Sequence, residues 1–403
     1  MYKTDAGDTF ERVARKVYGD GDEAGRIARS NPGVAEPMPA GVTLAIPAVP
    51  GAPVDRASQQ PAADPDAVSV AIDGARFRFW ESVRVTRSVD SIDTIGLGAP
   101  FDPNAPGFRD TFRPFSYRPI TVAIGGAPVF VGTMVDVKPN LSNTRNVSVS
   151  GYATPGVLQD CTAPASAYPL EFEGLDLRAI ASKLCEPFGV SVVFEAPAGA
   201  AFDSVALEPG SKILPFLHDL AKQRGLIVGS TERGALRFWR AVRPGSPVAR
   251  LREGAAPVMA VTPTFAPQEY YSHVTGIEPP DVGSDGAQFT TRNPALAGVL
   301  RPFAFTVADG EVAEATQAKA GRMFAGAAAY SVDVATWRDP AGELWRPNTT
   351  ITLEAPSAMI YSEYEFLIRS VTFNVDSDSR DAVLQLVIPQ AFRGEMPGAL
   401  PWD

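Results

Sequence analysis

The stretch that decides the fold of the N-terminal part reads Gly7-Asp-Thr-Phe-Glu-Arg-Val-Ala-Arg-Lys-Val-Tyr-Gly-Asp20. Asp8 can cap a helix, and Glu11 stands three residues later, where a capping-box partner belongs. Gly19 follows as a stop signal. The stretch therefore predicts a short amphipathic helix, whose apolar face comprises Phe10, Val13, Ala14 and Val17.

A second short helix and a strand complete this part of the chain. Ala24, Ile27 and Ala28 recur at helical spacing before Asn31-Pro32, which ends the helix, and the apolar residues of Gly41-Val-Thr-Leu-Ala-Ile-Pro47 alternate as in a strand. The strand–helix–helix–strand order, the Gly-Asp-Thr opening and the closing run resemble a LysM module. We therefore expect residues 1–47 to form a LysM-like βααβ module.

LysM modules usually bind glycan or serve as small docking units, so the resemblance implies two roles for the same residues. The candidate docking or glycan contacts are Asp8, Thr9, Asn31 and Pro32. The structural alternative is that Asp8 caps the helix while Asn31-Pro32 terminates the next one, and we prefer this alternative.

Composition excludes several classes of function. A chain of 403 residues is longer than one compact hydrophobic core usually serves, so several domains are expected. The formal charge of 36 minus 46, or −10, is the opposite of a basic nucleic-acid footprint, so no specific nucleic acid is expected as a partner. No apolar run approaches the ~20 residues that a membrane helix needs, and no signal peptide is visible.

The residue types that carry catalysis are scarce. Only His218 and His273 are present, and neither stands at a metal-ligand spacing. Cys161 and Cys185 carry no nucleophile signature, and two reduced thiols are the preferred interpretation, although a bridge between them stays open. We expect no enzyme activity, no metal and no cofactor.

The rest of the chain divides into a linker and three regions. Residues 48–66 are rich in proline and predict a semi-rigid linker. Alternating strands, with turns at Asp73-Gly74 and Gly125-Gly126, predict a small antiparallel β-barrel or sandwich over residues 67–155. Residues 156–245 predict a mixed α+β insert, with Asp176 and Ser211 as caps of its two helices. Residues 246–403 predict a second β-barrel with one helix, about residues 311–328.

Two hairpins in these β regions resemble each other. Residues 135–152 and 371–388 each read as a strand, a polar turn and a strand, and each follows a proline-containing loop and an alternating strand. A duplicated barrel is the sharper interpretation, and two ordinary hairpins are the alternative. The predicted fold class is α+β, mainly β, with two small antiparallel β-barrels flanking the insert.

The body of the chain resembles the baseplate hub protein of contractile-tailed phages, the late-control-D or gp27-like family. The resemblance follows one order along the chain, and the N-terminal module also resembles the small tail protein X. The stretches that carry it are Gly151-Tyr-Ala-Thr-Pro-Gly-Val-Leu-Gln-Asp160, Leu175 to Leu184, Ile213 to Val228, Leu344-Trp-Arg-Pro-Asn348, Ile368 to Phe373 and Leu384 to Phe392.

The resemblance implies a structural hub, a homotrimer whose paired barrels join the sixfold tail tube to the threefold central spike. The implied partners are the tail tube, spike and baseplate wedge proteins, together with the tape measure protein as a further candidate. The implied location is the virion tail baseplate, after assembly in the host cytoplasm, and an acidic lumen is expected. Candidate interface residues are Phe112, Phe115, Tyr117 and Trp345, with packing in the local core as the alternative for the first three.

Two other classes stay open at this point. A LysM-bearing protein could bind peptidoglycan or degrade the cell wall. The chain could also be the hub of a type VI secretion spike, although such chains usually continue into a spike domain.

Overall fold

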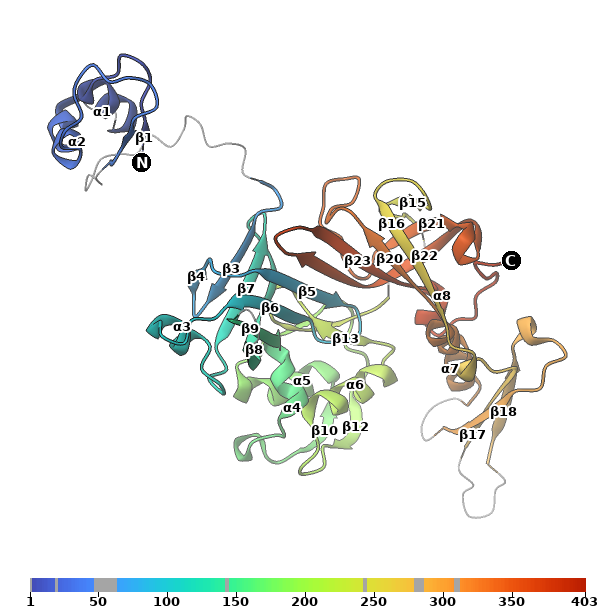
Figure 1. Ribbon diagram of the computed structural model, residues 1–403. Coiled ribbons are helices and arrows are strands. Elements are labelled where there is room, and N and C mark those ends of the chain that lie inside the picture. The colour runs from blue at the N-terminus through green and yellow to red at the C-terminus, as the bar shows by residue number, and fades with distance from the viewer. Residues whose placement is uncertain are drawn as a thin grey trace. The chain divides into compact units, whose positions relative to one another are not determined.

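The computed structural model describes residues 2–18, 21–46, 64–141, 145–241, 245–278, 286–307 and 312–403. The chain divides into two compact units, residues 1–65 and 66–403 (Figure 1). The boundary falls inside the predicted linker, most of which, residues 48–63, lies outside the described residues.

The N-terminal unit has the predicted strand–helix–helix–strand order. Its two strands pair antiparallel, with Tyr2 opposite Leu44. The predicted apolar positions form its core, where Val13, Ala14 and Ile27 are fully buried. The elements are β1 (Tyr2–Lys3), α1 (Phe10–Tyr18), α2 (Ala24–Ser30) and β2 (Thr43–Leu44).

The first β region of the second unit is an antiparallel arrangement in the order β5-β6-β9-β8-β7-β3-β4. Both predicted turns are present, since Ile72 pairs with Ala75 and Ile124 pairs with Ala127. Asp73 and Gly74 have φ values of 52° and 76°, which two-residue hairpin turns of this hand require. The elements are β3 (Val68–Ile72), β4 (Ala75–Phe77), β5 (Ser82–Ser88), β6 (Thr94–Pro100), α3 (Pro106–Thr111), β7 (Pro119–Ile124), β8 (Ala127–Leu141) and β9 (Arg145–Ala153).

The second β region follows the order β16-β20-β23-β22, with β21 beside the first half of β22 and β15 beside β21. The strands expected in this region, apart from the one predicted helix, are therefore present. The elements are β15 (Arg250–Arg252), β16 (Val258–Phe265), β20 (Ala328–Val334), β21 (Thr350–Ala355), β22 (Ile360–Val375) and β23 (Arg380–Val387).

One long strand joins the two β regions into a single sheet. The first half of β22 pairs with β21, and residues 370–375 pair with β5 on one side and β23 on the other. We call the pairing of β5 with residues 370–375 of β22 the internal joint. The result is a sheet of 13 strands whose described path runs openly from β16 to β4. The mainly β, α+β class is confirmed, but the prediction of two separate closed barrels is not, because no ring of described strands closes.

The insert lies between the two β regions in the chain and forms small sheets with two main helices. Asp176 caps α5 as predicted, because its Oδ1 accepts from Ala179 N at 2.8 Å. The Ser211 cap is wrong, since α6 begins after Lys212 without a side-chain cap. The elements are α4 (Val157–Asp160), β10 (Glu171–Leu175), α5 (Leu177–Cys185), β11 (Val192–Phe194), β12 (Phe202–Ala206), α6 (Ile213–Gln223), β13 (Ile227–Ser230) and β14 (Leu236–Trp239).

A small sheet and the predicted long helix complete the second unit. The sheet has the order β18-β17-β19, and α7 packs against it through Phe324 and Met323, near Val274. The helix predicted over residues 311–328 is observed at Val312–Ala327. The elements are β17 (His273–Ile277), β18 (Gln288–Arg292), β19 (Pro302–Thr306), α7 (Val312–Ala327) and α8 (Pro389–Phe392).

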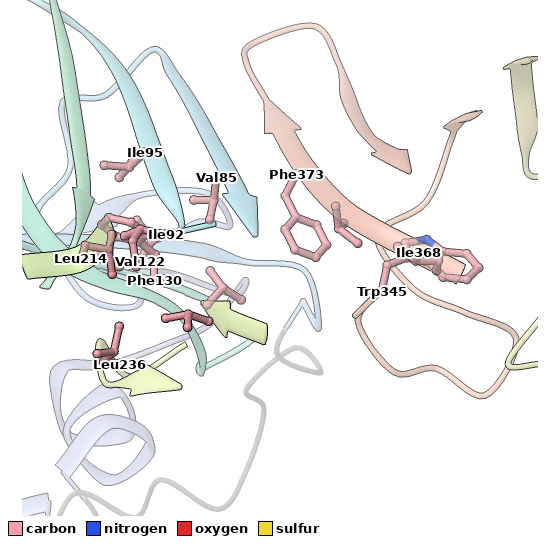
Figure 2. Packing of buried hydrophobic residues seen from close by; sticks show 14 of the residues in the cluster. Val85, Ile92, Ile95, Val122, Phe130, Leu214, Leu236, Trp345, Ile368 and Phe373 are labelled. Atoms are coloured by element: carbon pink, nitrogen blue, oxygen red, sulfur yellow. The ribbon is translucent and has the colours of Figure 1, made fainter. Parts of the chain in front are cut away.

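A continuous apolar core runs through both β regions and the insert. Figure 2 shows Val85 of β5 facing Phe373 of β22 across the internal joint, where the two residues are paired. Leu214 and Leu236 of the insert belong to the same cluster. Burial of this kind stabilises the joined arrangement by about 25 cal/mol for each Å² of apolar surface removed from water.

Candidate interaction sites

Asp8 is an internal structural residue of the N-terminal unit. Its carboxylate accepts from Asp5 N at 2.9 Å, from Lys16 Nζ at 2.9 Å and from Tyr2 Oη at 3.2 Å. The Asp5 backbone N–H, and then Lys16, hold the pKa of Asp8 below its ordinary value. The side chain is buried and these groups occupy its oxygens.

The predicted helix cap lies one residue later than expected. Helix α1 begins at Phe10, and Arg12 N donates to Thr9 Oγ1 at 3.2 Å, so Thr9 occupies the cap position that we predicted for Asp8. The physical reason is that Asp8 is already committed to the preceding turn.

Asn31 is likewise committed to internal bonds, whereas Pro32 is exposed. The Asn31 amide donates to Ile27 O and Ala45 O, at 2.8 and 2.7 Å, and Oδ1 accepts from Ala45 N at 2.7 Å. The side chain thus ties the end of α2 to the segment after β2. Of the four candidate glycan contacts, Thr9 and Pro32 keep accessible surface without such a network.

The four candidate interface residues divide into two kinds. Phe112 is buried and packs edge-on against Phe77, with ring centroids 5.7 Å apart. Trp345 is buried as well, and its indole N–H donates to Thr336 O at 2.9 Å. The interface prediction is therefore corrected for both, because each side chain fills the core of its own chain.

Phe115 and Tyr117 lie on the surface. They are 84% and 58% exposed, and both have positive φ, 59° and 48°. Left-handed backbone is costly for bulky residues, so this loop holds two aromatic rings in water at an energetic cost. The interface role of Phe115 and Tyr117 stays a prediction.

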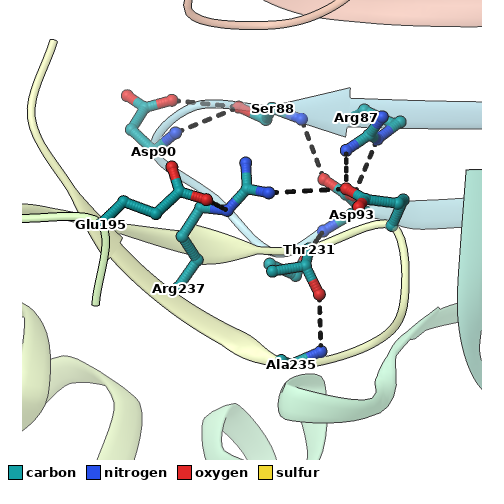
Figure 3. Close-up of polar contacts among 10 residues, drawn as sticks. Arg87, Ser88, Asp90, Asp93, Glu195, Thr231, Ala235 and Arg237 are labelled. Carbon is teal, nitrogen blue, oxygen red and sulfur yellow. Dashed lines mark hydrogen bonds and ion pairs between the residues drawn. The ribbon is translucent and has the colours of Figure 1, made fainter. Parts of the chain in front are cut away.

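A buried polar cluster connects β5 to the insert and was not predicted (Figure 3). Asp93 is 1% exposed; its carboxylate accepts from Ser88 N at 2.9 Å and contacts Arg87 Nε at 3.4 Å. Arg87 also pairs with Glu232 of the β13–β14 turn at 3.1 Å. Burial raises the pKa of Asp93 to about 7, and Arg87 offsets this only in part. The sequence signal was the run of polar residues directly after an alternating strand.

The pKa of Glu232 shifts in the opposite direction to that of Asp93, because Glu232 lies at the rim of this cluster. Burial opposes its ionisation, but its own backbone N–H and the guanidinium of Arg87 outweigh burial, so the pKa of Glu232 is lowered. Arg237 reaches both Glu232 and Glu195, at 3.4 and 3.1 Å. The cluster therefore fixes the insert against the sheet through paired charges.

A cleft of about 560 Å³ lies between the insert and the C-terminal helices. It contains His218, and burial lowers the pKa of that imidazole. The cleft wall is basic, although Arg369 is held there by Asp90 at 2.9 Å. The other basic lining residues are Lys222, Arg240, Arg322 and Arg393.

Neither cysteine is bridged, so Cys161 and Cys185 are free thiols. Within the described ranges, no three or more His, Cys, Asp or Glu side chains gather in a way that could hold a metal ion. No helix in the described part of the chain has the length and apolarity needed to span a membrane.

The two β regions share one strand plan. The first module is β5-β6-β9-β8-β7-β3 in spatial order, and the second module is β16-β20-β23-β22-β21-β15. Strands β6 to β9 are consecutive in the chain, and so are β20 to β23. The two sets occupy equivalent places in the two spatial orders. The modules differ at one edge, where β3 is antiparallel to β7 and β15 is parallel to β21.

The central hairpins agree in register as well as in order. In β8–β9 the pairing shifts after Met134, and six pairs follow, from Asp136–Ser150 to Leu141–Arg145. In β22–β23 it shifts after Ile368, and six pairs again follow. Even the hydrogen bonds beside the bulges agree, since Met134 N donates to Arg118 O and Ile368 N to Thr349 O, both at 2.9 Å.

The comparisons with known proteins fall on both units. The family described as "Baseplate hub protein gp44-like, second domain" matches residues 155–240, which is nearly the predicted insert. The family described as "Phage Tail Protein X" matches residues 2–54. Both units of the chain therefore resemble phage tail proteins, and the insert resembles a domain of a baseplate hub protein.

The baseplate hub protein gp44 of Escherichia phage Mu is 27% identical over 323 residues, 76% of this chain and 83% of that protein. The 43 kDa tail protein of prophage MuSo2 from Shewanella oneidensis has a similar structure, with a TM-score of 0.70, 25% identity, and coverage of 81% of this chain and 99% of that one. A tail protein from Neisseria meningitidis MC58, at 22% identity, shares the fold with a TM-score of 0.68, covering 82% of this chain and 99% of that one.

The predicted resemblance to baseplate hub proteins, with a tail protein X-like N-terminal part, is thus confirmed. These relatives are named as baseplate hub and tail proteins and not as enzymes, which agrees with the prediction that the chain is not an enzyme. The resemblance to LysM modules stays a prediction.

Proposed function

We propose that this chain is a structural hub of a contractile-tail baseplate, and that three copies form a ring containing six equivalent β modules. The observation that carries the proposal is the repeated strand plan, with the same bulge and the same six pairs beyond it in both hairpins. A chain with two like modules in a trimer presents a nearly sixfold face to one partner and a threefold face to another. The proposed partners are therefore the sixfold tail tube and the threefold central spike.

The remaining contacts follow from the same geometry. The exposed aromatic loop with Phe115 and Tyr117 is a candidate contact with a neighbouring copy or with a baseplate wedge protein. The N-terminal unit is proposed to act as a docking module, because two of its four candidate glycan contacts are held in internal hydrogen bonds. The tape measure protein is a further candidate partner, and assembly is proposed to occur in the host cytoplasm before incorporation into the virion tail.

The test of this function is the mass of the full chain in solution by light scattering. A mass of three chains supports the proposal, and a monomer at all concentrations would count against it. The competing role, a LysM-bearing protein that acts on the cell wall, predicts that the chain pellets with purified peptidoglycan and clears it in a zymogram.

A further inference from the structure

Several edges of the sheet have no partner strand among the described residues, and two of them are β16 and the end of β8. Strand β16 pairs only with β20, and Met259 on it is 56% exposed. Residues 136–141 of β8 pair only with β9, because β7 ends its pairing at Thr133. Open edges of this kind are templates for another strand, so a folded protein covers or blunts them.

The internal joint indicates which strands cover these two edges. In the joint, β5 pairs with residues 370–375 of β22. The equivalent of β5 in the second module is β16, and the equivalent of residues 370–375 in the first module is residues 136–141 of β8. The edges of β16 and of residues 136–141 are therefore the counterparts of the two strands that already join the modules within one chain.

We propose that β16 of one copy pairs antiparallel with residues 136–141 of β8 in a second copy, as a repeat of the internal joint. This inference rests on the proposed function, because a ring needs an outward contact of the same kind at each module. The occupant is a second copy of this chain, since the intramolecular joint is the template.

The register follows from the equivalences. Thr372 faces Thr86 in the internal joint, with their hydroxyls 3.0 Å apart. The first residues after the two bulges are Ser370 and Asp136, and Thr372 and Lys138 each lie two residues further on. Thr372 therefore corresponds to Lys138. Thr86 pairs with Thr94 of β6, and Thr264 pairs with Ala329, the residue of β20 that is equivalent to Thr94. Thr264 is therefore the counterpart of Thr86. Lys138 is therefore expected opposite Thr264 of the partner subunit, and Asn140 opposite Thr262 of the partner subunit.

The new joint has fewer hydrogen bonds than the internal one. Val89 N donates to Arg369 O at 2.9 Å, so by the alternation of antiparallel pairing Phe373 and Val85 form a hydrogen-bonded pair. Their counterparts are Pro139 and Pro263, neither of which has an N–H. Proline at an outward position suits an edge strand and discourages uncontrolled pairing. The contact between copies is thus weaker than the joint within a chain, which favours a ring held by several joints together.

The experiment uses pairs of cysteines in the full chain, in a background without the two native cysteines. The matched pairs are Lys138→Cys with Thr264→Cys, and Asn140→Cys with Thr262→Cys. Both positions correspond to pairs without mutual backbone bonds, where side chains lie closest. The mismatched controls exchange the partners, Lys138→Cys with Thr262→Cys and Asn140→Cys with Thr264→Cys.

Under mild oxidation the matched pairs should give disulfide-linked dimers and trimers on a non-reducing gel, at least about tenfold faster than the mismatched controls. Light scattering on the same samples separates the two proposals. Trimers in which matched and mismatched pairs link equally, or not at all, would overturn the strand pairing and leave the hub function standing. Monomers without cross-links would count against both.

Discussion

The buried carboxyl of Asp93 predicts an unusual pH dependence of stability. Its pKa is raised from an ordinary 3.8 to about 7 because burial penalises the charged form, and Arg87 and Ser88 offset this only in part. Between these two values the folded chain holds a proton that the unfolded chain has released. Stability contributed by this group is therefore fully present below pH ~4 and is lost as the pH rises towards 7.

The size of the effect follows from the shift. A group that binds one more proton when folded changes the free energy of unfolding by up to about 1.4 kcal/mol per pH unit. Over roughly three units this amounts to a loss on the order of 4 kcal/mol. The Asp93→Asn variant keeps the shape of the neutral carboxyl but cannot ionise, so its unfolding free energy lacks this slope.

The assay is urea unfolding of the wild type and of Asp93→Asn at several pH values between 5 and 8. The variant should gain stability relative to the wild type as the pH rises, because only the wild type must ionise a buried acid. Other titrating groups are common to both proteins and cancel in the difference. Parallel pH profiles, or a wild type that gains on the variant, would show that Asp93 does not hold an extra proton in the folded chain.

Three further predictions follow from other parts of the structure. Thr9→Ala removes the cap of α1 and should cost about 1 kcal/mol, seen as faster amide hydrogen exchange in the first turn of α1. Trp345→Ala should cost about 3–5 kcal/mol in urea unfolding, whereas Phe115→Ala should leave the midpoint unchanged, since only Trp345 is buried. In Gly132→Ala the new Cβ would lie 2.1 Å from Tyr152 O, so β8 and β9 must separate, and thermal unfolding should show a loss of about 1–3 kcal/mol.

Local patterns predicted the elements well because their causes lie within a few residues. The apolar spacing around Val13 and the turn at Asp73-Gly74 each act through neighbours in the chain. The cap at Asp176 formed as predicted, whereas the cap expected at Asp8 moved to Thr9 because Lys16 and a preceding backbone N–H engage the Asp8 carboxylate.

The remaining errors concern contacts between distant parts of the chain. Whether an aromatic side chain lies in the core or in water depends on elements far away in sequence, so Phe112 and Phe115 could not be told apart from their pattern. The internal joint pairs Ser88 with Ser370, and no local sequence pattern predicts a pairing between residues so far apart in the chain. For the same reason the sequence led to two separate barrels, whereas one strand carries the sheet from one module into the other.

The likeness of the two hairpins was visible in the sequence, but its strength was not. The sequence showed a strand, a polar turn and a strand after a proline-containing loop and an alternating strand, and many hairpins share the first three of these features. The structure adds an equal number of pairs beyond each bulge and a matching hydrogen bond beside it, at Met134 and Ile368. Register is a stronger criterion than order, because a slip of one residue would exchange the two faces of a strand.

A ring of three chains, each of which supplies two equivalent modules, can be observed directly. The most direct measurement is a cryo-EM reconstruction of the assembled baseplate without imposed symmetry, in which the copies of this chain are counted and their modules superposed. We expect three copies whose six modules stand at nearly equal angles around the tail axis. A different number of copies, or modules that do not superpose under that rotation, would contradict it.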